Sequence, residues 1–204
     1  MKRRSVVFEG YDGSGKSSLI DAVRASLVGN DIRVVGRKTE PELLGISSVL
    51  EREDLRPLPN VEVLLRIALE IERQCVIDRS LRNHDMVFCD RGMISLLSWF
   101  DYLHVAREQY EPLLQGLMDY HCNSLTVVCE ADFDTCWTRV NDRSIKSWKE
   151  RQGFELNRRY FAMYENSVRC YAATGADLVF IDTAQSSLAE SADHIKRVLD
   201  SRGL

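Results

Sequence analysis

The stretch GYDGSGKSS, residues 10–18, combines glycines, a lysine and hydroxyl side chains in a spacing suited to phosphate binding. It matches the pattern G-x-x-x-x-G-K-[ST], in which glycines let several backbone N–H groups approach one phosphate. Lys16 then reaches the outer phosphates, and the hydroxyl of Ser17 is a ligand for a bridging Mg²⁺. The nucleotide-binding residues expected from this motif are Gly10, Gly13, Ser14, Gly15, Lys16, Ser17 and Ser18.

A second group of charged residues follows an apolar run in the segment VFCDRGMIS, residues 87–95. Asp90 is expected at the carboxyl end of a parallel strand, beside the phosphate loop, where it can serve the metal ion or an acceptor hydroxyl. Arg91 supplies a guanidinium suited to a phosphate group. The alternative is an aspartate that caps the next helix, with a solvated arginine beside it.

These residues need elements that bring them together, and the pattern of apolar residues predicts such elements. Strands are expected at residues 5–9, 32–36, 86–90, 125–130 and 178–182. Helices are expected at residues 16–27, 61–81, 93–103, 110–120, 133–140, 154–173 and 187–199. The alternation predicts an α/β fold with a parallel sheet that helices cover on both faces. No repeat or linker divides the sequence, so one domain spanning residues 1–204 is expected.

Composition limits the classes of protein to which the chain can belong. Its 204 residues are 45% hydrophobic and 28% charged, as in soluble chains that bury one core. The net charge of −4 argues against a protein that coats nucleic acid. No run approaches the roughly 18 apolar residues of a membrane span, and the apolar run after the basic N-terminus is too short for a signal peptide. Six cysteines without a CxxC pair favour reduced thiols, no zinc site and a cytoplasmic location.

Residues 139–159 reverse the charge of the chain. They hold seven basic and three acidic residues, a local balance of +4. Such a segment can neutralise the charge on phosphate oxygens. The alternative for each of these basic side chains is a solvated helix face.

The motifs together resemble those of the thymidylate kinase family of nucleoside monophosphate kinases. FEGYDGSGKS at residues 8–17 is similar to the family's F-E-G-x-[DE]-G-x-G-K-[ST] loop, and DRGMIS at residues 90–95 to its D-R-[YH]-x-x-S segment. Glu40-Pro41 resembles the R-E-P loop, and residues 179–199 resemble the final strand and helix. The resemblance implies a five-stranded P-loop kinase fold with ATP and Mg²⁺ at the loop and an acceptor nucleotide across the cleft. It also suggests a homodimer packed through helices.

The resemblance implies roles for individual residues. Asp12 corresponds to the acidic residue that approaches the acceptor's sugar hydroxyl, and Arg91 to the arginine that contacts the acceptor phosphate. Asp90 is expected beside the metal ion. The acceptor-binding residues carried over in this way are Asp12, Thr39, Glu40, Arg66, Glu70, Arg91 and Ser95.

By the same resemblance, the basic segment corresponds to a mobile helical lid that closes over ATP. Arg143 and Arg151 are the candidates for the lid arginine that contacts the transferred phosphoryl group. Arg139 is expected on the adenine side.

The acceptor pocket departs from the family pattern. Arg66 stands where an aromatic residue stacks on thymine, and Glu70 replaces the arginine that donates to the base. Thr39 takes the place of the arginine in the R-E-P loop, and Gly92 the place of Tyr or His. Because ionised Glu only accepts hydrogen bonds and Arg only donates them, a base that offers a donor is expected if Glu70 faces the cleft.

The alternative for these residues is a salt-bridged, exposed helix face formed by Glu62, Arg66, Glu70 and Arg73.

The sequence leaves three functions open. The first is an ATP-dependent kinase of a (deoxy)nucleoside monophosphate. The second is a kinase of another hydroxyl, on a nucleoside or on a hydroxylated base that is free or in DNA, with DNA not favoured. The third is a nucleotide switch without an acceptor, against which stands the absence of an N-K-x-D motif.

Overall fold

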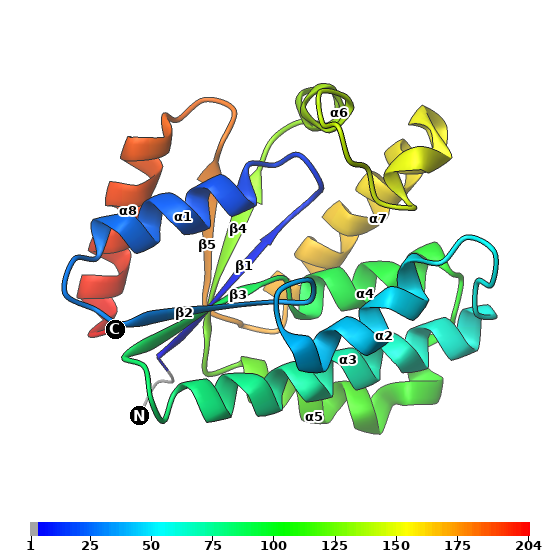
Figure 1. The fold of residues 1–204 in the computed structure, drawn as a ribbon, viewed down its shortest axis with the longest axis horizontal. Helices are drawn as coiled ribbons and strands as arrows, with labels where there is room; N and C mark the ends of the chain where they lie inside the picture. The colour runs from blue at the N-terminus through cyan, green and yellow to red at the C-terminus, as the bar shows by residue number, and fades with distance from the viewer. Residues whose placement is uncertain (1–3) are drawn as a thin grey trace.

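The computed structural model describes residues 4–204, and in this range the chain forms one sheet of five parallel strands (Figure 1). They are β1 (Ser5–Gly10), β2 (Ile32–Gly36), β3 (Met86–Asp90), β4 (Leu125–Glu130) and β5 (Leu178–Asp182). The order β2-β3-β1-β4-β5 places β1 in the centre. Phe8 of β1 is in register with Asp90 of β3, so the loops after these two strands begin side by side. The predicted strands are confirmed, and β1 is one residue longer than expected.

Helices cover both faces of the sheet, as predicted (Figure 1). On one face lie α1 (Lys16–Ser26) and α8 (Leu188–Arg202). On the other lie α2 (Pro41–Glu51), α3 (Pro59–Ser80), α4 (Met93–Tyr102), α5 (Glu111–His121), α6 (Phe133–Asn141) and α7 (Phe154–Ala172). Val6 and Phe8 of β1 pack toward α1 and α8, whereas Val7 packs toward the other face. Burial on both faces explains why the strands are almost continuously apolar.

The helix α2 was not expected from the sequence. Only Leu43, Ser47 and Leu50 of this helix are buried, so its apolar stripe is narrow, and Gly45 interrupts it. Pro41 occupies its first turn, where the missing N–H costs nothing. For the same reason α3 begins at Pro59, two residues before the predicted start.

The sequence also led to expectations about the N-terminus, membrane spans, the cysteines and the oligomeric state. Residues 1–3, which include part of the basic N-terminus, lie outside the described residues. Within residues 4–204, no helix combines the length and apolar character that a membrane span needs. The six cysteines carry free thiols, three of them buried in the core. The homodimer stays a prediction.

Glu9, at the carboxyl end of β1, is fully buried and acts as the cap of another element. Its Oε1 accepts hydrogen bonds from the backbone N–H groups of Gly92 (2.8 Å) and Ser95 (3.0 Å), and the Ser95 hydroxyl donates to Oε2 (2.6 Å). These groups lie at the N-terminus of α4, which no side chain of its own N-cap residue caps. A carboxylate is favourable there because it pairs open N–H groups and the positive end of the helix. Glu9 therefore ties β1 to the turn after β3.

We predict that Glu9→Ala lowers the free energy of unfolding by about 2–4 kcal/mol, because it removes three hydrogen bonds from buried groups. Urea denaturation measures the loss. The matched control is Glu190→Ala, which removes the exposed carboxylate half of the capping box of α8, leaves the Ser187 cap in place and should cost much less. Equal losses in the two variants would contradict the capping role of Glu9.

Candidate active site

The phosphate loop, residues 10–18, runs from the end of β1 into the first turn of α1 and lines a cleft. Gly13 and Gly15 have φ angles of 88° and 81°, which favour glycine. A Cβ atom at Gly13 would lie 2.2 Å from the carbonyl oxygen of Cys136, so no side chain fits there. Gly15 is the N-cap of α1 and no side chain caps this helix. The N–H groups of its first turn are therefore open to an anion.

Lys16 and Asp90 form an ion pair across the carboxyl ends of β1 and β3, with 2.6 Å between Lys16 Nζ and Asp90 Oδ1. Burial alone would raise the pKa of Asp90, but the attraction of Lys16 and Arg91 outweighs it and lowers the pKa below its ordinary value. Ser17 and Asp90 line the same cleft. Hydroxyl and carboxylate oxygens, completed by phosphate oxygens and water, are the donors that Mg²⁺ takes. These two residues thus fit a Mg²⁺ ion.

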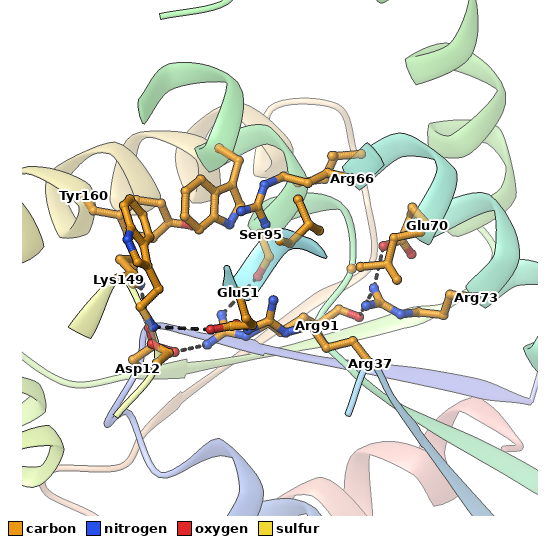
Figure 2. Close-up of a pocket in the computed structure, with 17 residues that line it drawn as sticks. Asp12, Arg37, Glu51, Arg66, Glu70, Arg73, Arg91, Ser95, Lys149 and Tyr160 are labelled. Carbon is orange, nitrogen blue, oxygen red and sulfur yellow. Dashed lines mark hydrogen bonds and ion pairs between the residues drawn. The ribbon is translucent and has the colours of Figure 1, made fainter. Parts of the chain in front are cut away.

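Asp12 is half-buried between two cations (Figure 2). Arg91 Nη2 pairs with one carboxylate oxygen of Asp12, and Lys149 Nζ lies 2.5 Å from the other. Burial would raise the pKa of Asp12, but Lys149 and Arg91 together hold it well below the ordinary range. Arg91 Nη1 also donates to the carbonyl oxygen of Gly10 at 3.0 Å. The carboxylate of the phosphate loop thereby joins the turn after β3 to the segment that carries Lys149.

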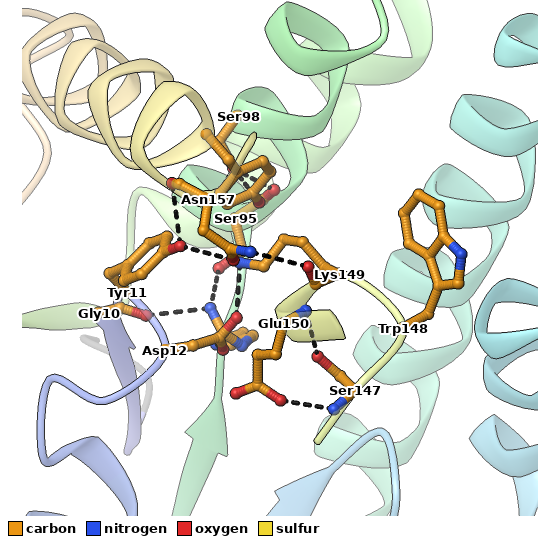
Figure 3. Close-up of polar contacts among 12 residues, drawn as sticks. Gly10, Tyr11, Asp12, Ser95, Ser98, Ser147, Trp148, Lys149, Glu150 and Asn157 are labelled. Carbon is orange, nitrogen blue, oxygen red and sulfur yellow. Dashed lines mark hydrogen bonds and ion pairs between the residues drawn. The ribbon is translucent and has the colours of Figure 1, made fainter. Parts of the chain in front are cut away.

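Lys149 is buried although it comes from the segment between α6 and α7 (Figure 3). Its Nζ lies 3.8 Å from the ring centroid of Tyr160 and 4.4 Å from that of Tyr11. Burial lowers the pKa of Lys149 to about 8, against the opposing attraction of Asp12. Asn157 Nδ2 donates to the Lys149 carbonyl at 2.9 Å, and the Tyr11 hydroxyl lies 3.0 Å from Asn157 Oδ1. The phosphate loop, the basic segment and α7 therefore meet at one point.

A second cleft adjoins the first (Figure 2). The residues that line both are Asp12, Arg37, Arg91 and Ser147. Arg37 directly follows β2 and pairs with Glu51 at 2.7 Å. Trp148 and Lys149 of the basic segment form part of the wall of the second cleft, and the backbone N–H of Trp148 donates to Glu51 at 3.3 Å.

Arg66 and Glu70 of α3 both line this second cleft and are 7% and 3% exposed, so the alternative of an exposed helix face is wrong. Their ion pairs join Arg66 to Glu62 at 2.5 Å and Glu70 to Arg73. The guanidinium carbon of Arg66 lies 3.4 Å from the ring centroid of Trp99. Burial lowers the pKa of Arg66 to about 10, against the effect of Glu62. The arginine is therefore charged at neutral pH and stacked on an aromatic face.

Residues 5–172 match a family model described as an AAA domain. The chain belongs to the AAA domain family. It is similar to a thymidylate kinase of Halalkalibacterium halodurans, with 26% identity over 204 residues that cover 95% of this chain and 94% of that protein. It is also similar to a thymidylate kinase of Bdellovibrio bacteriovorus, with 34% identity over 104 residues that cover 48% of each chain. These matches and the fold make the chain a thymidylate-kinase-like P-loop NTPase, as its motifs predicted.

In this P-loop NTPase, most residues predicted to bind the nucleotide lie together. Those that line the first cleft are Gly13, Ser14, Gly15, Lys16, Ser17 and Ser18. Gly10 contributes its carbonyl oxygen to Arg91. Arg139 donates to the carbonyl oxygens of Gly13 at 3.3 Å and Thr183 at 3.1 Å, so it lies against the phosphate loop.

The two predicted lid arginines are placed differently. Arg143 lines the first cleft, where it pairs with Glu150 at 3.0 Å. Arg151 is not among the residues that line either of these two clefts, and it pairs with Glu53 at 2.9 Å. The structure thus brings Arg143, and not Arg151, to the phosphate loop.

The predicted acceptor residues are also divided. Thr39 lines the first cleft, and its hydroxyl is hydrogen-bonded to the backbone N–H and carbonyl groups of Gly36. Ser95 lines the second cleft, with its hydroxyl between Glu9 and Arg91. Glu40 lies outside both of these clefts, and its buried carboxylate pairs with Arg33 at 2.9 Å.

Sequence reasoning did not assign a binding or catalytic role to several residues that the structure brings to the clefts, namely Arg37, Arg73, Trp148 and Lys149. Arg37 could have been found, because it follows β2 as Arg91 follows β3, and parallel strands end at the same edge. Lys149 was counted within the basic segment but not singled out. Its burial depends on Tyr11 and Tyr160, which no local pattern connects to it.

We predict that Lys16→Ala weakens the binding of a non-hydrolysable ATP analogue by at least about tenfold, because it removes the buried cation of the phosphate loop. Isothermal titration calorimetry measures the affinity. The fold should persist, since no apolar core residue is changed, and circular dichroism checks this. An unchanged affinity in a folded Lys16→Ala variant would contradict the role of the loop.

Proposed function

We propose that this protein transfers the γ-phosphoryl group of ATP to the phosphate of a (deoxy)nucleoside monophosphate, within one kinase domain. The observation that carries the proposal is the junction of the two clefts. One cleft holds the phosphate loop, and the other is lined by the guanidinium groups of Arg37, Arg73 and Arg91. The thymidylate kinases to which the chain is similar support the same class of reaction.

In the proposed reaction, a phosphate oxygen of the acceptor attacks the γ-phosphorus of ATP. A new P–O bond forms, the bond from the γ-phosphorus to the oxygen that bridges it to the β-phosphorus breaks, and ADP leaves with that oxygen. Such a transfer depends chiefly on alignment of the two substrates and on neutralisation of phosphate charge. A Mg²⁺ ion held by Ser17 and Asp90 would add to that neutralisation.

The side chains at the junction of the two clefts supply the alignment of the substrates and the remaining positive charge. Lys16 faces the outer phosphates of ATP. Arg37 and Arg91 line both clefts, and we assign them to the acceptor phosphate. Asp12 fixes Arg91 by an ion pair. Lys149 is the buried cation of the lid and reaches the same carboxylate, so we assign it to the transferred phosphoryl group in place of Arg151.

The other functions fit the second cleft less well. A neutral nucleoside or hydroxylated base gives the guanidinium groups of that cleft no anion to bind. Asp12 is a weak base for such a hydroxyl, because Lys149 and Arg91 hold its pKa well below the ordinary range. A switch without an acceptor leaves the second cleft unexplained. The expected contact of Glu70 with the acceptor base is not favoured, because its two carboxylate oxygens already pair with Arg73 and His121.

We predict that labelled ATP with Mg²⁺ phosphorylates a nucleoside monophosphate in a panel of natural and base-modified monophosphates, nucleosides, and single- and double-stranded DNA. The product is a nucleoside diphosphate, which thin-layer chromatography detects. Label on a nucleoside or on DNA, with none on any monophosphate, would support the kinase of another hydroxyl. Slow release of phosphate without any labelled acceptor would support the nucleotide switch.

We also predict that kcat/KM for the acceptor falls about tenfold between pH 7 and pH 9, because Lys149, with a pKa of about 8, is charged below that pH and neutral above it. Lys149→Arg should move the fall to higher pH, since a guanidinium stays protonated. Lys146→Arg, in the same segment, is the matched control and should keep the wild-type profile. A profile that Lys149→Arg leaves unchanged would assign the titration to another group.

A further inference from the structure

The backbone of Arg91 adopts a conformation that residues other than glycine rarely take. Its φ angle is 76°, in the left-handed region. Its N–H donates to the Phe8 carbonyl at 2.9 Å, and the next N–H, of Gly92, donates to Glu9 at 2.8 Å. Its carbonyl oxygen accepts a hydrogen bond from Arg73 Nη1 at 3.0 Å. The turn after β3 is therefore held from β1 on one side and from α3 on the other.

This turn directs the Arg91 side chain back toward the phosphate loop. Its guanidinium donates to the Gly10 carbonyl at 3.0 Å and to the Ser95 hydroxyl at 3.2 Å, and it pairs with Asp12. A change in the backbone at Arg91 would move the guanidinium away from these partners. The position of the guanidinium thus depends on the bonds that keep the turn.

Arg73 pairs with the buried Glu70 (Figure 2), and Glu70 is in turn paired with the buried His121. Glu70, one turn earlier on α3, pairs with Arg73 through Oε2 and lies 3.1 Å from His121 Nε2 through Oε1. Glu70 and Arg73 are 3% exposed and His121, from α5, is 2% exposed. Burying charged groups is costly unless they are paired. The hydrogen bond to the Arg91 carbonyl gives the buried, charged Arg73 a structural role.

Arg73 Nη1 bonds to Glu70 and to the Arg91 carbonyl at once, whereas Arg73 Nε is buried and has no hydrogen-bond partner. Nη1 is therefore committed to the turn after β3, and a role of the remaining donors in reading the acceptor base is tested by comparing several bases.

We propose that Arg73, held by Glu70 and His121, is a positioning residue that keeps the Arg91 backbone in its turn and so aims the Arg91 guanidinium at the acceptor phosphate. The inference rests on the proposed function for the identity of the acceptor. The geometry of the turn can be tested without it.

The first experiment is hydrogen exchange of the peptide that spans residues 91–95 in Arg73→Met. Exchange in this peptide should become at least about tenfold faster, while a peptide from α8 is unchanged. Arg79→Met is the matched control, because Arg79 lies on the same helix and pairs with Glu42 at the surface. If Arg73→Met exchanges faster in every peptide or fails to fold, Arg73→Lys becomes the deciding variant, because it keeps a cation and most of the volume. The same exchange measurement on Arg73→Lys then tests the positioning role. Unchanged exchange at residues 91–95 in the deciding variant overturns the inference, whether or not the protein phosphorylates a monophosphate.

The second experiment measures steady-state kinetics with several nucleoside monophosphates. Arg73→Met should raise KM for each acceptor by at least about tenfold and by the same factor for every base, with KM for ATP within about twofold of wild type. Arg79→Met should match wild type. A factor that differs between bases would make Arg73 a base reader and overturn the positioning role. If wild-type protein phosphorylates no monophosphate, the proposed function fails, and the exchange experiment still tests the turn.

Discussion

The ion pairs of Asp12 with Arg91 and Lys149 are the interaction on which the rest of the site depends. All three side chains are largely buried, and a buried charge that loses its partner is strongly destabilising. Because the three residues come from the phosphate loop, the turn after β3 and the segment before α7, one carboxylate fixes three elements that are far apart in the sequence. Glu9 strengthens the same junction, since it joins the end of β1 to the start of α4.

The fold could be predicted almost completely, because the features that determine it are local. Each strand is a short apolar run, and the long helices carry broad apolar stripes. The parallel arrangement follows from the alternation of the two. Helix α2 could not be predicted, because Leu43, Ser47 and Leu50 form a narrow stripe that becomes recognisable only when the helix packs against α3.

The candidate site was predictable where its residues are neighbours in the sequence, as in the phosphate loop and in Asp90-Arg91. It was not predictable in the second cleft, whose walls come from α2, α3, α4, α7, the turns after β1, β2 and β3, and the segment before α7. Arg66 illustrates the reason. Glu62 and Glu70 lie four residues before and after it, so helical spacing permits both pairs. The structure selects Glu62, because Glu70 is taken by Arg73 and by His121 of another helix, and these contacts depend on tertiary packing.

The five cations that line the second cleft are each paired with a carboxylate of the chain, and this pairing bears on which anions can bind there. The cations are Arg37, Arg66, Arg73, Arg91 and Lys149, and their partners are Glu51, Glu62, Glu70 and Asp12. An entering phosphate has to compete with these carboxylates for the same donors. A dianionic phosphate competes better than a neutral hydroxyl, because its attraction to each guanidinium is stronger and it can accept hydrogen bonds from several donors at once. The internal pairs thus support the proposed phosphorylated acceptor over a neutral one, and they compensate the cations of the cleft by carboxylates of the chain itself.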